Sequence, residues 1–137
     1  MKNQEFEQRI EKYLKRQFGI TISAASKRQV YEALMSMVRE KLSEKKFAYE
    51  QELKKTKQKR AYYMSMEFLV GRTLRNNLFN LGIEKETKEY LEKNNFNLDE
   101  IYDIEPDPGL GNGGLGRLAS CYLDALTSSD YPVTGFS

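Results

Sequence analysis

Histidine and tryptophan are absent from this 137-residue sequence, and cysteine occurs once, as Cys121. Without histidine the chain lacks the commonest general base and metal ligand, and one thiol allows neither an internal disulfide nor a cysteine-based zinc site. We therefore expect no bound metal. Cys121 falls in a segment typical of a helix, and we expect it to be packed among apolar neighbours rather than reactive.

Long hydrophobic runs are also missing. No stretch approaches the roughly 18 apolar residues that a membrane span requires, and the first residues contain no hydrophobic signal region. A lone cysteine suits a reducing compartment, so we expect a cytoplasmic protein without a membrane partner. At this length one modest domain is the natural expectation.

Net charge is small, at +2, but it is unevenly distributed. Residues 1–60 hold 16 basic and 8 acidic side chains, whereas residues 61–137 hold 6 and 12. The basic half could suggest nucleic acid. Its charges are interleaved with acids at helical spacing, however, which is more typical of solvated helix faces. We therefore expect no nucleic-acid partner.

Hydrophobic spacing predicts a mostly helical chain. Residues 4–17 form a first amphipathic helix that Gly19 ends, and Ser26 is the expected N-cap of a long second helix. The apolar stripe of that helix runs through Val30, Leu34, Met37, Val38 and Leu42, and more weakly through Phe47 and Leu53. The aromatic segment 60–66 predicts a strand. Helices follow at 73–81, 84–94, 98–105 and 114–129, and a second strand begins within 131–136.

The most informative stretch is GLGNGGLGRL, residues 109–118, which contains five of the nine glycines. Glycine loops let a backbone approach a ligand closely, and the first N–H groups of the following helix have no intrahelical acceptor. Such an arrangement predicts an anion-binding loop. A tight turn that only allows close helix packing is the alternative.

Two nucleotide-binding motifs fit this loop poorly. G-x-G-x-x-G occurs twice, but a dinucleotide fingerprint follows a buried strand, and residues 101–108 are acidic and contain two prolines. A P-loop requires lysine and then a hydroxyl side chain after its last glycine, where this chain has Arg117 and Leu118. Glu67 follows the predicted first strand directly. In open α/β sheets ligands bind beyond the carboxyl ends of the strands, which is where Glu67 is expected. Glu67 is therefore either a site residue or a surface acid.

Two segments carry a family resemblance. YYMSMEFLVGR, residues 62–72, resembles the Y-Y-x-S-x-E-F-x-x-G-R segment of the α-glucan phosphorylases, which include glycogen, starch and maltodextrin phosphorylases. DPGLGNGGLGRLASC, residues 107–121, is similar to their glycine-rich stretch almost letter for letter. The chain thus resembles the N-terminal portion of a bacterial-type α-glucan phosphorylase, over about residues 26–134.

The resemblance implies an enzyme that uses phosphate to cleave α-1,4-glucan and release glucose 1-phosphate. It implies pyridoxal 5'-phosphate as cofactor, held as a Schiff base, with its phosphate group exchanging protons. By the same resemblance, Gly113 and Gly114 give backbone N–H groups to substrate phosphate and cofactor, Asn112 and Leu115 line the glucosyl pocket, and Glu67 lies nearby. The implied fold is α/β: the mostly helical N-terminal part of a Rossmann-like, glycosyltransferase-B type domain with an incomplete sheet. A homodimer is a further implication for the whole enzyme.

The chain also departs from that family. Members run to roughly 800 residues, and the cofactor lysine, the basic phosphate ligands and the catalytic-site histidine fall outside this sequence. Gly135-Phe136-Ser137 replaces an expected glycine-tyrosine-glycine, which suggests a truncation or a frameshift. We expect N-terminal helices over 1–59 and the start of the catalytic α/β domain over 60–137. We also expect the helices to leave apolar surface exposed where the rest of the sheet would pack, and no activity for the chain alone. A non-enzymatic helical interaction module and a small nucleotide-binding protein are the alternative functions.

Overall fold

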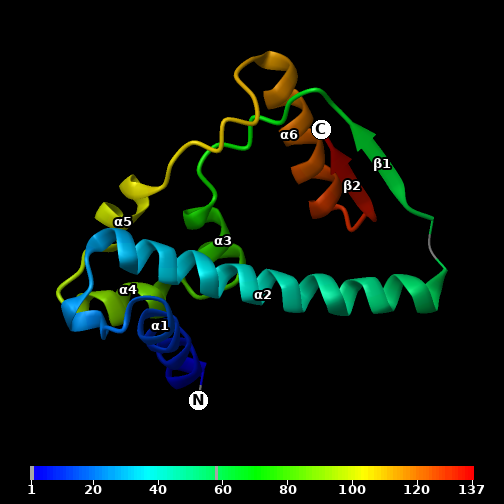
Figure 1. Ribbon diagram of the computed structural model, residues 1–137. Coiled ribbons are helices and arrows are strands. Elements are labelled where there is room, and N and C mark those ends of the chain that lie inside the picture. The colour runs from blue at the N-terminus through cyan, green and yellow to red at the C-terminus, as the bar shows by residue number, and fades with distance from the viewer. Residues whose placement is uncertain (1, 58) are drawn as a thin grey trace. The chain divides into compact units, whose positions relative to one another are not determined.

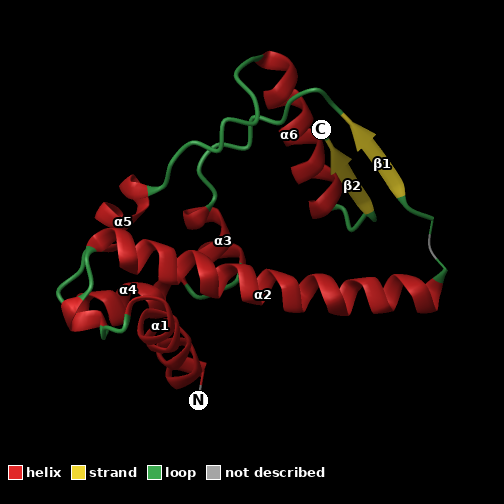
Figure 2. Cartoon of the chain, in the orientation of Figure 1, coloured by secondary structure: helices red, strands yellow, loops and turns green. Residues whose placement is uncertain are grey.

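A computed structural model describes residues 2–57 and 59–137, and Figure 1 shows the order of its elements. Among the described residues, helices predominate and two short strands pair with each other (Figure 2). This confirms a mostly helical α/β chain. The elements are α1 (Lys2–Phe18), the 3-10 helix η1 (Ile22–Ala24), α2 (Lys27–Thr56), β1 (Ala61–Met64), α3 (Leu74–Asn80), α4 (Glu84–Lys93), α5 (Leu98–Ile104), α6 (Gly114–Ser128) and β2 (Val133–Phe136).

The chain divides into two compact units. The helical unit comprises residues up to Lys46 together with Thr73–Pro106, and the strand unit comprises Phe47–Arg72 together with Asp107–Ser137. Each unit is therefore built from two separate lengths of sequence, and α2 begins in the helical unit and ends in the strand unit. No described helix combines the length and the apolar character needed to cross a membrane.

Two predicted helix boundaries in the helical unit have clear local causes. Gly19 takes φ +69° at the end of α1, a left-handed conformation that glycine adopts without strain, and its N–H donates to the Lys15 carbonyl. Ser26 begins α2 with a reciprocal capping box: the Gln29 N–H donates to Ser26 Oγ at 3.3 Å, and the Ser26 N–H donates to Gln29 Oε1 at 2.9 Å. The predicted N-cap is confirmed.

The core of the helical unit is formed by the predicted apolar stripes of α1 and α2, joined by side chains of α3, α4 and α5. Burying such side chains is the main favourable term in folding, at about 25 cal/mol per Å² of apolar surface removed from water. Its largest fully buried side chains include Ile10, Leu14, Val30, Leu34, Met37, Val38, Leu74, Leu78, Leu91 and Ile101.

Part of the predicted stripe of α2 is wrong. Leu42 is 41% exposed and Phe47 67% exposed, although Leu53, further along the same helix, is buried. A helical period shows which positions share a face of the helix. Whether another element covers that face depends on tertiary packing, which the period does not record.

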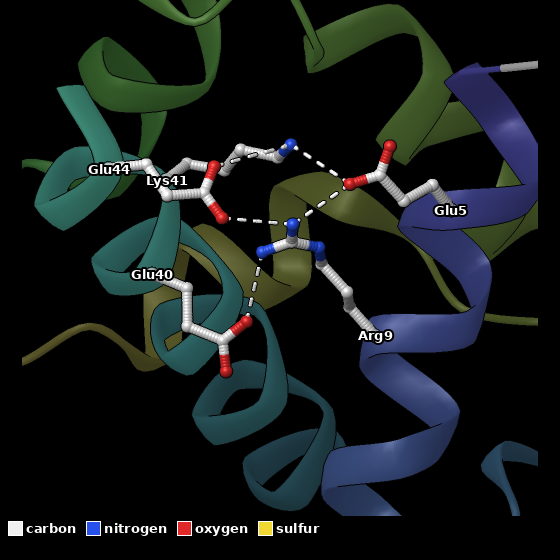
Figure 3. Close-up of polar contacts among 5 residues, drawn as sticks. All are labelled: Glu5, Arg9, Glu40, Lys41 and Glu44. Carbon is white, nitrogen blue, oxygen red and sulfur yellow. Dashed lines mark hydrogen bonds and ion pairs between the residues drawn. The ribbon is translucent and has the colours of Figure 1, made fainter. Parts of the chain in front are cut away.

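A cluster of five charged side chains links α1 to α2 in the helical unit (Figure 3). The Arg9 guanidinium lies 2.8 Å from a carboxylate oxygen of Glu5, 3.1 Å from Glu40 and 2.9 Å from Glu44. Lys41 approaches Glu5 at 3.4 Å and Glu44 at 3.9 Å. A planar guanidinium with several donors suits this multiple pairing better than an ammonium does. The cluster therefore adds a polar connection beside the apolar contact between the two helices.

The strand unit contains one parallel strand pair. Ala61, Tyr62, Tyr63 and Met64 of β1 pair in register with Val133, Thr134, Gly135 and Phe136 of β2. The two predicted strand segments are thereby confirmed. Parallel strands need a crossover connection rather than a tight turn, and here α6 immediately precedes β2 and contacts it.

The two faces of this strand pair differ in coverage. On one face the Tyr63 ring contacts Phe68 at 6.0 Å and Tyr122 of α6 at 6.1 Å, measured between ring centroids. On the other face Tyr62 is 61% and Met64 82% exposed, and the Phe136 ring contacts Tyr62 at 5.6 Å. Parallel sheets are usually covered on both faces. The face of the strand pair that carries Tyr62 and Met64 therefore has exposed apolar surface.

Cys121 of α6 is exposed, which corrects the expectation of a packed thiol. The buried face of α6 is formed by Gly116, Ala119 and Ser120. Small residues on that face allow close approach of a neighbouring backbone. Apolar residues near Cys121 in the sequence are themselves partly exposed: Tyr122 is 49% and Leu118 51% exposed.

Candidate functional site

The glycine-rich loop leads directly into α6. Gly109 has φ +65°, Gly113 is the N-cap residue in an extended conformation, and the helix begins at Gly114. No strand leads into the loop, because α5 ends at Ile104 and irregular backbone follows. A dinucleotide-binding fingerprint has a strand at this point. The structure therefore confirms that the motif lacks the context that dinucleotide binding requires.

Backbone after β1 packs against this loop inside the strand unit. The Phe68 N–H donates to the Leu110 carbonyl at 2.8 Å, and the Leu69 N–H donates to the Gly116 carbonyl at 3.0 Å. A Cβ added at Gly111 would lie 2.8 Å from the Leu69 nitrogen, closer than real Cβ contacts occur. Gly111 is therefore required by close backbone approach, a reason that is independent of any ligand.

Glu67 lies beside the middle of the loop. The Asn112 N–H donates to Glu67 Oε2 at 2.8 Å, and a Cβ added at Gly113 would lie 3.6 Å from Glu67 Oε1. A Cβ added at Gly116 would lie 3.0 Å from Glu67 Cγ. The structure thus brings Glu67 together with Asn112 and Gly113, three of the residues predicted for the site from separate parts of the sequence.

The first turn of α6 presents free donors. Among the described residues, none accepts a hydrogen bond from the N–H of Gly113, Gly114 or Leu115. Gly114 is exposed and an added Cβ there would meet no atom within 4 Å, while Leu115 is 55% exposed. Open N–H groups at a helix N-terminus, together with the positive end of the helix dipole, can bind an anion.

Ser65 is a residue of this region that the sequence analysis missed. Its hydroxyl donates to the Glu67 carbonyl at 2.8 Å, and its N–H donates to the Phe136 carbonyl at 3.0 Å. Ser65 therefore connects the strand pair to Glu67. A serine two residues before Glu67 was a weak signal, because serine side chains commonly bond to nearby backbone.

Metal ligands do not gather in the part of the chain that the structure describes. No group of three or more His, Cys, Asp or Glu side chains there is placed to hold an ion. The Glu67 carboxylate instead accepts a hydrogen bond from the backbone N–H of Asn112. Its neighbourhood offers hydrogen-bond donors to an anion and one charged acceptor to a hydroxyl group, in adjacent positions.

Comparison with known proteins agrees with the two sequence motifs. A family model described as carbohydrate phosphorylase matches residues 91–137. A glycogen phosphorylase of Chlamydia pneumoniae is 42% identical over 113 residues, covering 82% of this chain and 14% of the relative. A glycogen phosphorylase of Bacillus subtilis (strain 168) is 42% identical over 117 residues, covering 85% and 15%.

A plant protein matches over a shorter stretch. Alpha-glucan phosphorylase 1 of Arabidopsis thaliana is 51% identical over 78 residues, which is 57% of this chain and 8% of the relative. The chain spans about one seventh of the length of the first two relatives. Because the matches cover most of the chain and include both the Glu67 segment and the glycine loop, this chain belongs to the carbohydrate phosphorylase family.

Proposed function

We propose that this chain is part of an α-1,4-glucan phosphorylase, an enzyme that uses inorganic phosphate to cleave α-1,4-glucan and release glucose 1-phosphate. The observation that supports it most concerns the N–H groups of Gly113, Gly114 and Leu115 beside the Glu67 carboxylate, which have no acceptor among the described residues. The family resemblance points to the same chemistry. We further propose that the 137 residues alone are inactive, because one anion-binding loop does not make a complete site.

The glycine loop contributes fixed dipoles to this reaction. In the proposal, the N–H groups of Gly113 and Gly114 bind phosphate oxygens, and Asn112 and Leu115 line the glucosyl pocket. Donors that are already oriented before substrate arrives stabilise developing charge without reorganising. Glu67, within hydrogen-bond distance of Asn112, is available to accept a hydroxyl of the glucosyl unit.

The open donors also fit the phosphate group of pyridoxal 5'-phosphate. A Cβ at Gly114 would meet no atom within 4 Å, so a phosphate has room to approach the first turn of α6. When bound, this cofactor would supply a phosphate group that exchanges protons with the substrate phosphate. Gly113 and Gly114 would make non-covalent contacts with it, and we propose that the covalent lysine belongs to sequence outside this chain.

The strand unit supports a proposal about the fold of the whole domain. A parallel strand pair with α6 on one face is compatible with the start of a Rossmann-like, glycosyltransferase-B type domain. The predicted division into N-terminal helices over 1–59 and the catalytic domain from residue 60 stays a proposal, as do a homodimer of the whole enzyme and a cytoplasmic location.

Two measurements on the purified chain test this function. Inorganic phosphate should shift the backbone amide resonances of Gly113, Gly114 and Leu115, whereas NAD and ATP should not. Maltoheptaose with phosphate should yield no glucose 1-phosphate. Amide shifts with NAD but not with phosphate would favour a nucleotide-binding protein instead, and release of glucose 1-phosphate would contradict the proposed inactivity.

A further inference from the structure

We propose that Glu67 is a positioning residue, whose carboxylate holds the middle of the glycine loop so that the N–H groups of Gly113, Gly114 and Leu115 stay oriented outward. The link to phosphate rests on the proposed function. The positioning itself rests on the contacts of the strand unit alone, and the experiment below separates the two.

The loop is held at three points by one short segment after β1. Backbone bonds from Phe68 and Leu69 fix its two ends, at Leu110 and Gly116. The Glu67 carboxylate fixes its middle, at the Asn112 N–H. Among the described residues, only this hydrogen bond joins residues 111–115 to a partner outside the loop and α6. Removing the carboxylate therefore leaves the middle of the loop without an external partner.

Glu67 is itself fixed to the strand pair. Ser65 donates its hydroxyl to the Glu67 carbonyl and its N–H to the Phe136 carbonyl. The connection thus runs from β2 through Ser65 and Glu67 to Asn112. Holding a loop in one conformation opposes about 1–2 kcal/mol of backbone entropy per residue, so a fixed anchor is needed. A carboxylate accepting a backbone N–H is one of the stronger hydrogen bonds available.

The glycine pattern makes room for this carboxylate. At Gly116 an added Cβ would approach Glu67 Cγ to 3.0 Å and Oε2 to 3.1 Å, and at Gly113 it would lie 3.6 Å from Oε1. At Gly114, which faces away, an added Cβ meets nothing within 4 Å. The glycine at 116 is therefore explained in part by the side chain it accommodates, whereas a Cβ at 113 would make an ordinary van der Waals contact with it.

The negative charge of Glu67 and its role as a hydrogen-bond acceptor can be separated. A carboxylate beside an anion-binding loop repels the anion, so the negative charge of Glu67 does not itself favour phosphate. If Glu67 acts by accepting the Asn112 N–H, glutamine can replace it, since its amide oxygen is also an acceptor. Glu67→Gln should then keep the loop in place and bind phosphate as well as the natural chain or better.

Amide hydrogen exchange of the purified chain, followed by NMR, tests the positioning. In Glu67→Ala we expect exchange at Asn112 to accelerate by about tenfold or more, as for a lost hydrogen bond to a charged group. Glu67→Gln should stay within about threefold of the natural chain. Asp107→Ala is the matched control, because Asp107 accepts the Gly109 N–H in the same loop at 2.9 Å. It should accelerate Gly109 and leave Asn112 unchanged.

Two results would overturn the inference: unchanged Asn112 exchange in Glu67→Ala, or equal acceleration of Asn112 in Asp107→Ala. If Glu67→Ala does not fold, Glu67→Asp replaces it. Aspartate keeps the charge but is one methylene shorter, so it should no longer reach Asn112 and should accelerate exchange there.

A phosphate titration of the same variants connects positioning to binding. We expect Glu67→Ala to weaken phosphate binding at Gly113–Leu115 by about tenfold and Glu67→Gln to rescue it. Undiminished phosphate affinity in Glu67→Ala, with Asn112 exchange accelerated, would overturn the role in orienting donors. If phosphate shifts no amide of the natural chain while the exchange results hold, the proposed function fails and the positioning role stands.

Discussion

The buried carboxylate of Glu105 accepts the backbone N–H of Leu74, with Oε2 at 3.0 Å from the nitrogen, across 31 positions of sequence. Its other oxygen accepts the Thr73 N–H at 2.8 Å and lies 3.2 Å from Thr73 Oγ1. Thr73 occupies the N-cap of α3 but makes no side-chain capping bond of its own. A distant glutamate therefore satisfies the first N–H groups of this helix, within the helical unit.

Glu105→Ala should lower the free energy of unfolding by about 2–3 kcal/mol, because it leaves buried backbone donors without an acceptor. Urea unfolding followed by circular dichroism measures the change. Glu100→Ala is the control: Glu100 pairs with Lys27 at 2.9 Å, but both side chains are more than half exposed, so its loss should cost under about 1 kcal/mol. Equal effects of the two variants would contradict the capping role.

Gly111→Ala and Gly114→Ala form a matched pair in the glycine loop. A methyl group at Gly111 would meet the Leu69 backbone at 2.8 Å, whereas at Gly114 it would meet nothing within 4 Å. We expect Gly111→Ala to destabilise the chain by about 1–3 kcal/mol, as overpacking does, and Gly114→Ala to be neutral or slightly stabilising. Thermal unfolding of both variants measures the two changes in stability. A larger loss of stability for Gly114→Ala than for Gly111→Ala would contradict the close packing of Gly111 against the Leu69 backbone.

Acid should weaken the cluster of Figure 3. The hydrogen bond from Arg9, with further contributions from Lys41, lowers the pKa of Glu5 below 4.5. Because the folded-state pKa is lowered, the stabilisation is present above about pH 4.5 and is lost as pH falls through the lower value. We expect Glu5→Gln to flatten the loss of stability on acidification. Unfolding midpoints measured from pH 6 to 3 test this, and identical pH profiles for both chains would refute it.

The Tyr90 hydroxyl should lose its proton at a higher pH than an ordinary tyrosine does. Burial raises the pKa of its hydroxyl far above 10, and Glu11, whose Oε1 lies 3.4 Å from that hydroxyl, raises it further. A raised folded-state pKa gives stability that is complete below about pH 10 and declines above it. Ultraviolet titration of the nine tyrosines should show a late step that Tyr90→Phe diminishes. An unchanged late step would contradict the assignment of Tyr90 to it.

Local signals were sufficient for most of the fold. Gly19, the Ser26 cap and the aromatic strand at 61–64 each depend on residues close in sequence, and the structure has all three. The proximity of Glu67 to the glycine loop was expected from the family resemblance. Sequence spacing alone had left Glu67 open as either a site residue or a surface acid.

Long-range packing accounts for what the sequence did not reveal. Glu105 follows an acidic helix and has no local feature that marks it as the cap of α3. Leu42 and Cys121 were expected to be packed and are exposed, because burial depends on which elements cover a face. The Asn112 N–H bond to Glu67 joins positions 45 residues apart, and no local pattern encodes such a distance.

Residues Thr73–Pro106 of the helical unit separate, in sequence, the two lengths of chain that form the strand unit. This sequence order determines the order in which the two units can fold during synthesis. Every described residue of the helical unit has been made once Pro106 is added, so that unit can form before β2 exists. The strand pair must wait for residues 133–136, and it joins segments separated by about 70 residues. Pairing across so long a separation is slow. Until it occurs, the Tyr62 segment remains an unpaired strand edge that a nascent chain must keep away from its neighbours.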